Sequence, residues 1–140
     1  MKNLKFNYLL IAFFTLFILS SNTSIGKKTD LVGTWQICRP DYSPETKLGG
    51  REGTTRYLII GQNTVVIAEA AISEKTFIAM FIGTYSIDND NLMEQILYTN
   101  PGLKSYKDKV LNYQIELKDS FLIKKGIDNP YNEIWKRIKL

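Results

Sequence analysis

Hydrophobic and polar residues alternate along much of this chain with the two-residue period of a β-strand. The alternation is clearest between residues 111 and 117, where one side carries Leu111, Tyr113, Ile115 and Leu117 and the other carries Asn112, Gln114 and Glu116. Because successive side chains of a strand point to opposite faces, this segment predicts a strand with one buried face and one face in water. The pattern contains no long amphipathic helix.

Strands are predicted wherever a short run rich in β-forming residues lies between clusters of Gly, Pro, Asn or Asp. In chain order, these runs span residues 31–38, 56–60, 64–68, 76–87, 92–98, 111–117, 120–125 and 132–140. The segment from Ala68 to Lys75 fits either an extension of the third strand or one helical turn, and Gly83 is the easiest place for a bulge. About eight short strands with local connections predict an all-β meander, which closes into a barrel or stacks into a sandwich.

Two connections are long. Residues 41–53 carry three glycines and Pro44 and almost no apolar residues, and long ordered loops of this kind often cover binding sites. Residues 99–109 form a second, polar loop. The short segment 88–91 is interpreted as a plain turn, because Leu92 and Met93 follow it where a calcium loop needs Asp or Asn and then Gly.

The fourth predicted strand is apolar on both faces from Phe77 to Ile82, and two interpretations of it are open. In the first, the core buries one face and the long loop or a neighbouring element buries the other. In the second, one face is an exposed apolar patch that contacts a partner protein or a membrane.

The first 26 residues differ in character from the rest. Lys2 and Lys5 precede an uncharged apolar run from Tyr8 to Leu19, and small residues follow. This order is typical of a secretory signal peptide, and the run is shorter than the roughly 20 residues that a membrane-spanning helix needs. We expect a helical signal peptide at residues 1–26, a folded domain at residues 27–140, and export to the periplasm or the exterior. Cys38 lies too far along the chain to carry a lipid after cleavage, so a lipoprotein is not expected.

The amino-acid composition limits the classes of function that are expected of this chain. The chain has 18 Lys and Arg and 14 Asp and Glu, and since Lys2 and Lys5 belong to the predicted signal peptide, the domain has a net charge of about +2. So small an excess predicts no nucleic-acid interface. The chain has no histidine, which is the commonest general base and transition-metal ligand. Its single cysteine excludes an internal disulfide and a thiolate metal cluster; Cys38 is interpreted as a small apolar residue, with a reactive thiol as the alternative.

The first and last predicted strands carry side chains that can meet. Glu133, Trp135 and Arg137 share one face of the last strand, and Trp35 lies on the first. If these strands pair, the sheet closes on itself. Arg137 then either stacks on Trp35 or faces the interior, where it would anchor a ligand carboxylate or pair with an acidic residue such as Glu94 or Glu133.

Four motifs give the chain a resemblance to a known family. They are Gly33-Thr34-Trp35-Gln36, Gly83-Thr84-Tyr85, Glu94 on a strand, and Glu133-Ile134-Trp135-Lys136-Arg137. With the long first loop, they make residues 30–140 resemble a lipocalin-like domain, and more closely a family of small exported bacterial domains of unknown function. The resemblance implies an eight-stranded antiparallel up-and-down barrel, in which Trp35 plugs the closed end and Arg137 lies across it. The Asp-Tyr pair that many lipocalins carry before a late loop is absent.

An eight-stranded barrel holds either packed side chains or one small ligand. Aromatic walls with Glu94 and Arg137 as polar groups suit a small apolar or amphipathic molecule, and the aromatic candidates are Tyr57, Phe77, Phe81, Tyr85, Tyr98, Tyr113 and Trp135. Glu94 lies inside if Ile96 and Tyr98 do; otherwise it is an ordinary exposed residue. The alternative function is a protein-interaction or inhibitory barrel, whose interior is filled and whose surface contacts a partner.

No pair of acidic residues stands out as an acid/base couple, and the chain lacks histidine, so we expect a binding protein rather than an enzyme. We expect no cofactor, no metal and no nucleic-acid partner. Contact with a membrane is expected only through the signal peptide before it is cleaved. The sequence leaves the oligomeric state open.

Overall fold

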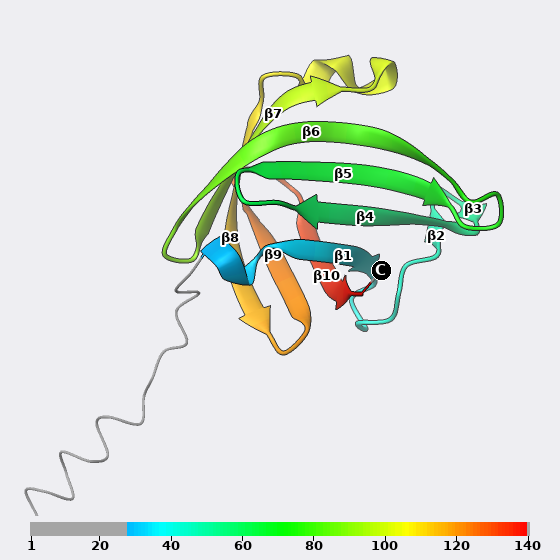
Figure 1. Ribbon diagram of the computed structural model, residues 1–140, viewed down its shortest axis with the longest axis horizontal. Helices are drawn as coiled ribbons and strands as arrows, with labels where there is room; N and C mark the ends of the chain where they lie inside the picture. Colours follow the sequence, from blue (N-terminus) through cyan, green and yellow to red (C-terminus); the bar gives the residue numbers. More distant parts are fainter. Residues whose placement is uncertain (1–27, 140) are drawn as a thin grey trace, which may run out of the picture.

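The computed structural model of the protein describes residues 28–139, in which eight antiparallel strands close into a barrel (Figure 1). Strands β4 to β10 follow one another around the barrel in chain order, and β1 completes it by pairing with both β4 and β10. This arrangement confirms the all-β, eight-stranded up-and-down barrel predicted from the sequence. The predicted signal peptide lies outside the described residues.

The barrel strands begin and end close to their predicted limits. They are β1 (Gly33–Cys38), β4 (Thr54–Ile60), β5 (Thr64–Ala71), β6 (Thr76–Asp88), β7 (Asn91–Thr99), β8 (Val110–Lys118), β9 (Phe121–Ile127) and β10 (Asn132–Ile138). The segment after Ala68, for which two structures were open, continues β5 rather than forming a helical turn. The two long loops contain short elements, namely the hairpin of β2 (Lys47–Leu48) and β3 (Arg51–Glu52) and the 3-10 helix η2 (Pro101–Tyr106); a further 3-10 helix, η1 (Lys28–Asp30), precedes β1.

Alternate side chains of each strand fill the interior, as the two-residue period predicts. The most deeply buried apolar side chains of the strands come from β1, β4, β7, β9 and β10, and they are Trp35, Leu58, Leu92, Leu122 and Trp135. On β8, Tyr113 and Ile115 are buried, whereas Asn112 and Gln114 are exposed. The predicted dry and wet faces of this strand are therefore confirmed.

One end of the barrel is closed by the contact between Trp35 and Arg137, which lie directly opposite each other in the pairing of β1 with β10. The guanidinium of Arg137 lies 4.2 Å from the centre of the indole ring. It donates hydrogen bonds to the backbone carbonyl oxygens of Val32, at 2.8 Å, and of Asp30. The indole N–H of Trp35 donates to the carbonyl oxygen of Leu31 at 3.0 Å. Of the two roles open to Arg137, the structure shows the stack on Trp35.

Two glycines allow backbones or side chains to approach closely. Gly33 has a φ of 151°, and a β-carbon there would lie 2.9 Å from a guanidinium nitrogen of Arg137. At Gly83, a β-carbon would lie 2.1 Å from the carbonyl oxygen of Gln95 on β7. The register between β6 and β7 shifts between Ile82 and Gly83, so an irregularity occurs next to the glycine where a bulge was expected, although the extra residue lies on β7 rather than on β6.

This bulge changes the direction of one predicted site residue. Gly83 pairs with Ile96, but Ile82 pairs with Tyr98, so Leu97 is an extra residue on β7. The extra residue reverses the alternation that follows it. Tyr98 therefore points outward, with 67% of its surface exposed, and the prediction that it lines the interior is wrong.

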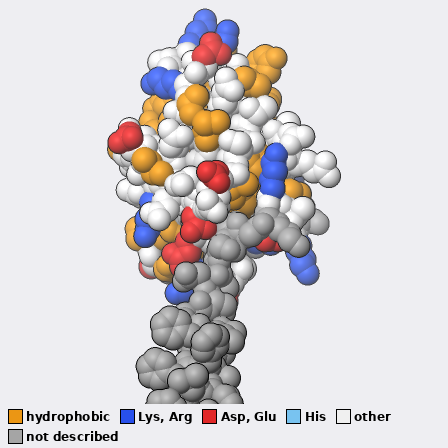
Figure 2. All heavy atoms as spheres, turned by 90° about the vertical axis from the view of Figure 1, so that its left-hand side faces the viewer, with side chains coloured by type: hydrophobic (Ala, Val, Ile, Leu, Met, Phe, Trp, Pro, Cys, Tyr) orange, Lys and Arg blue, Asp and Glu red, His pale blue; other side chains and the backbone are white. Residues whose placement is uncertain are grey.

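The surface of the barrel is mixed in character. On the face that Figure 2 presents, basic and acidic side chains are interspersed with hydrophobic ones, and neither sign of charge gathers into a large patch there.

At the start of β6, Phe77 and Ile78 are 74% and 65% exposed, so of the two interpretations of this segment the structure favours an exposed apolar patch. Within residues 28–139, no helix has the length and apolar character needed to cross a membrane.

Replacing Arg137 with alanine removes the stack on Trp35 and two hydrogen bonds to backbone carbonyls. An exposed cation–π contact contributes about 0.5–1 kcal/mol and a hydrogen bond about 1 kcal/mol. We therefore expect Arg137→Ala to lower the free energy of unfolding by about 2.5–3 kcal/mol, to lower the melting temperature by roughly 10 °C, and to change the tryptophan fluorescence. Lys136→Ala, whose side chain lies outside the barrel, is the control. Unchanged melting and fluorescence in Arg137→Ala would contradict the proposed closure.

Candidate functional site

Three charged side chains from three strands meet inside the barrel. Lys124 of β9 is fully buried, and its ammonium nitrogen lies 2.9 and 3.0 Å from the two carboxylate oxygens of Glu94 on β7. A carboxylate oxygen of Glu133 on β10 lies 3.3 Å from the same nitrogen. Lys124 thus bridges two acidic residues; these three side chains are called the charged cluster below.

Two aromatic side chains complete the surroundings of the charged cluster. The indole N–H of Trp135 donates a hydrogen bond of 3.0 Å to the carboxylate of Glu133. The ammonium nitrogen of Lys124 lies 4.0 Å from the centre of the Tyr113 ring. Each charge in the cluster therefore has a partner, as burial requires, because an unpaired charge in a low-dielectric interior is strongly destabilising.

The cluster fixes the protonation state of its lysine. Burial disfavours the charged form of Lys124, but the carboxylates of Glu94 and Glu133 outweigh this effect and raise its pKa. Burial raises the pKa of Glu94, and the positive charge of Lys124 opposes that rise. Lys124 is therefore an ammonium group held between carboxylates, and it is not available as a basic or nucleophilic amine at neutral pH.

The interior around the cluster is largely filled by side chains. A cavity beside Glu94, lined also by Phe81 and Gly83, has a volume of about 20 Å³, which is enough for about one water molecule. Between the cluster and the closed end, the described residues pack into a hydrophobic core that includes Trp35 and Leu122. The sequence was compatible with an interior packed with side chains or with one that has room for a ligand. The deep part of the lumen is packed with side chains.

The lumen widens at the opposite end of the barrel from Trp35, which we call the mouth. A cavity of about 250 Å³ lies there, and it is called the mouth cavity. Tyr113 and Glu133 line it, and since both also contact Lys124, the charged cluster lies at its base. The walls are mainly apolar and come from β5, β6 and β8: Ile67, Met80, Phe81 and Leu111.

The 3-10 helix η2, which extends beyond the end of β7 in Figure 1, supplies one more wall of the mouth cavity. Leu103 and Tyr106 of η2 line the cavity. The hydroxyl oxygen of Tyr106 lies 2.7 Å from that of Tyr131, a residue just before β10. The ring of Tyr106 packs against that of Phe81, with ring centroids 5.5 Å apart. The loop at residues 99–109, predicted only to be polar, therefore contributes apolar side chains to the site.

One arginine reaches into the mouth cavity. Arg56 lies on β4 and lines the cavity, and its Nε atom is buried with no hydrogen-bond partner among the described residues. The other charged residue of the lining is Glu133, whose carboxylate already contacts Lys124 and Trp135. The mouth cavity therefore combines apolar and aromatic walls with one guanidinium.

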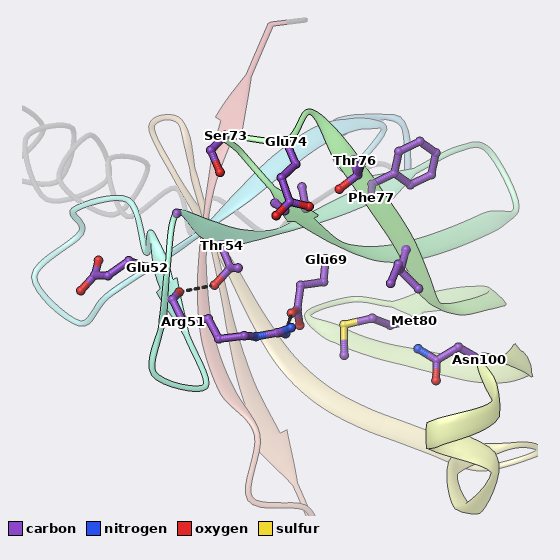
Figure 3. Close-up of a pocket in the computed structure, with 14 residues that line it drawn as sticks. Arg51, Glu52, Thr54, Glu69, Ser73, Glu74, Thr76, Phe77, Met80 and Asn100 are labelled. Atoms are coloured by element: carbon purple, nitrogen blue, oxygen red, sulfur yellow. Dashed lines mark hydrogen bonds and ion pairs between the residues drawn. The ribbon is translucent and has the colours of Figure 1, made fainter.

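A second cavity, of about 440 Å³, lies further out, and Met80 lines both cavities. It lies between the β2–β3 hairpin and the turn that joins β5 to β6. In Figure 3, Arg51 of the hairpin and Glu69 of β5 reach toward each other and form an ion pair. The first long loop therefore contributes to the edge of the mouth, where a loop that covers a binding site would lie.

The structure brings together part of the predicted set of site residues. Glu94, Tyr113 and Trp135 lie in or against the charged cluster, and Phe81 lines the mouth cavity. Tyr85 is buried near the closed end, where its hydroxyl donates to the backbone carbonyl of Gly61 at 2.9 Å, and Arg137 lies at that end as well. Tyr85 and Arg137 are therefore separated from the mouth.

Two further candidates, Tyr57 and Phe77, lie outside the barrel. Tyr57 alternates with the fully buried Leu58 on β4, and together with Phe77 it lines an apolar groove of about 380 Å³ on the outer surface of β4, β5 and β6. The prediction that they line the interior is wrong. Both belong to segments with apolar residues at successive positions, where alternation does not show which face is turned inward.

Four residues of the site that carry polar groups were not predicted from the sequence: Arg56, Tyr106, Lys124 and Tyr131. A signal for one of them exists, because Lys124 and Glu133 are directly paired on β9 and β10 and each shares a face with a large apolar residue, Leu122 or Trp135. The tyrosines carry no such signal, since they lie in connections.

Cys38 lies apart from the site. It is a free, buried thiol at the end of β1, where the backbone of the first long loop bridges to it at Pro44. Burial raises the pKa of this thiol, which disfavours the reactive thiolate. These features agree with a small apolar residue rather than a reactive one.

The fold and the site together define a small closed β-barrel with a charge-paired, largely filled interior and a cavity at its open end. The chain belongs to the family described as Domain of unknown function (DUF4488), whose model matches residues 30–140. This membership agrees with the resemblance to lipocalin-like domains of unknown function. A solved structure, titled REP1-NXSQ fatty acid transporter, is similar with 20% identity, a TM-score of 0.38, and coverage of 80% of this chain and 98% of that chain. A likeness of this size says nothing about a ligand. No curated protein matches the chain.

Replacing Lys124 with methionine leaves two carboxylates buried without a cation between them. Removing one partner of a buried ion pair costs about 3–5 kcal/mol, and we expect Lys124→Met to lower the free energy of unfolding by that amount. The loss should grow with pH. Without the ammonium, the pKa of Glu94, already raised by burial, rises further above its ordinary 4.5, so the folded state binds the proton more tightly and stability falls as pH rises through that range.

Thermal melts at about pH 5 and about pH 8 measure this effect. Lys125→Met, which changes the neighbouring lysine on the outward face of β9, is the matched control and should behave like the wild type. Adding Glu94→Gln to Lys124→Met should restore part of the stability at the higher pH. A loss of equal size at both pH values would contradict the assigned role of the cluster.

Proposed function

We propose that this protein is an exported barrel that binds one small apolar or amphipathic molecule in the mouth cavity. The observation that carries the proposal is the cavity of about 250 Å³ at the open end, above an interior that is otherwise largely filled. Pockets for drug-sized ligands hold roughly 300–1,000 Å³, so this cavity suits a molecule smaller than those.

The lining of the cavity supports this class of ligand. Apolar and aromatic side chains form most of it, and the polar groups are few: the guanidinium of Arg56, the carboxylate of Glu133 and the tyrosine hydroxyls. Ligand pockets commonly combine such walls with a small number of placed polar groups. The fixed partners of Glu133 and Tyr106 hold these groups in position before a ligand arrives.

We propose that the protein binds its ligand without catalysing a reaction on it. Lys124 is held as an ammonium between carboxylates, and Cys38 lies outside the mouth with a raised thiol pKa. Neither offers the activated nucleophile or poised base that covalent or acid–base catalysis uses.

Export to the periplasm or the exterior remains part of the proposal. It rests on the basic start, apolar run and small residues of the first 26 positions. The N-terminal sequence of the protein isolated from its native host checks it: a mature chain that starts near residue 27 is expected, and an uncleaved chain in the cytoplasm would contradict export.

The second candidate function is a protein-interaction barrel. The outer apolar groove of about 380 Å³ and the exposed side chains of Phe77 and Ile78 favour it. It differs from the first candidate in using the outer surface of β4 to β6, so that substitutions in the mouth cavity would not affect it.

Protein purified from its native host without detergent should carry a small molecule into the mass spectrometer under native conditions and release it on denaturation. The same preparation of Leu103→Trp should carry much less, because a larger side chain on η2 fills the cavity. Met93→Trp, at an exposed position of β7, controls for the added indole and should retain the molecule. An empty wild-type protein, or a Leu103→Trp variant loaded as fully as the wild type, would overturn the proposed mouth site.

A further inference from the structure

Arg56 is the charged group of the mouth cavity that the protein itself does not neutralise. Its Nε atom is buried without a hydrogen-bond partner, and within residues 28–139 no ion pair joins this side chain to an acidic group. Glu69, which lies opposite Arg56 in the pairing of β4 with β5, forms its ion pair with Arg51. A buried donor of a charged group left without a partner is costly, since desolvation is not offset by a new hydrogen bond. In native proteins such a group is usually completed by water or by a ligand.

The other charges near the mouth are already paired. Glu133 contacts Lys124 at 3.3 Å and accepts a hydrogen bond from Trp135 at 3.0 Å. Arg51, at the outer edge, forms its ion pair with Glu69. The charge that remains available to a ligand inside the mouth cavity is therefore positive, and it belongs to Arg56.

From these observations, and resting on the proposed function, we propose that Arg56 recognises the acidic group of the ligand, so that the ligand class is a small organic anion with a compact apolar body. A guanidinium presents several N–H donors in one plane and can hold a carboxylate through two parallel hydrogen bonds. Phe81, Tyr106 and Leu111 would then contact the apolar body of the same molecule. The size of the cavity, about 250 Å³, limits that body to a ring or a short chain.

A cationic ligand is the strongest competing idea, because aromatic rings and a carboxylate also line the cavity. Two features disfavour it. The carboxylate of Glu133 is neutralised by Lys124, and a cation among the rings would share the cavity with the guanidinium of Arg56. Charge repulsion therefore opposes the binding of a cation, whereas an anion would accept hydrogen bonds from the guanidinium of Arg56.

Three probes with the same carbon skeleton test this choice: 4-phenylbutanoate, 4-phenylbutan-1-ol and 4-phenylbutylamine. Each is titrated into the ligand-free wild-type protein at neutral pH, with calorimetry or tryptophan fluorescence as the readout. We expect the acid to bind about tenfold or more tightly than the alcohol, and the amine to bind more weakly than the alcohol.

Arg56→Gln should remove the preference for the acid and change the affinity for the alcohol by no more than about twofold. Arg51→Gln is the matched control, since it removes an arginine at the same mouth that is already paired, and it should keep the preference of the wild type. Arg56→Lys retains the charge without the planar fork and should keep part of the preference. If Arg56→Gln fails to fold, the comparison of three probes on the wild type and on Arg56→Lys still decides the question.

The outcomes separate the two proposals. If the alcohol binds and the acid binds no better, or if Arg56→Gln keeps the preference for the acid, the role of Arg56 is wrong while the mouth site stands. A preference for the amine would replace the anion by a cation. If none of the three probes binds the wild type, and the protein from its native host is empty, both the mouth site and the role of Arg56 are overturned.

Discussion

The geometry of this barrel is set by the pairing of its first strand, β1, with its last, β10. An open meander would leave two unpaired strand edges, and closure removes both. The contact that joins these strands at the closed end is the stack of Arg137 on Trp35, supported by hydrogen bonds from the guanidinium to the chain that leads into β1. Because closure determines which side chains face inward, the charged cluster and the mouth cavity both follow from it.

The charged cluster divides the lumen into two parts with different properties. Toward the closed end, apolar side chains pack as in an ordinary core. Toward the mouth, the lining becomes more polar and leaves space. Lys124, Glu94 and Glu133 come from three different strands, so their mutual pairing is satisfied only in one register of those strands. We infer that the cluster favours this register, even though a buried ion pair is weak support for stability itself.

Part of the mouth is assembled from segments that lie outside the regular alternation of the strands. The 3-10 helix η2 brings Tyr106 over the cavity, the chain before β10 brings Tyr131 to meet it, and the β2–β3 hairpin places Arg51 at the outer edge. Connections can change without disturbing the core, which is why binding residues concentrate there. Arg56, in contrast, lies on β4, so its charge is held by the rigid wall of the barrel.

Alternation, turn residues and motif spacing predicted about eight strands in chain order and an irregularity near Gly83, because these signals are local. They also placed Arg137 on a face from which it could reach Trp35, and the structure showed that it stacks there. Which face of an apolar run turns inward depends on how the strands pair around the barrel. Tyr57 and Phe77 lie outside for this reason, and the extra residue Leu97 turned Tyr98 outward. The partners of Lys124 and the isolation of Arg56 were likewise decided by register between strands distant in sequence, which no single segment encodes.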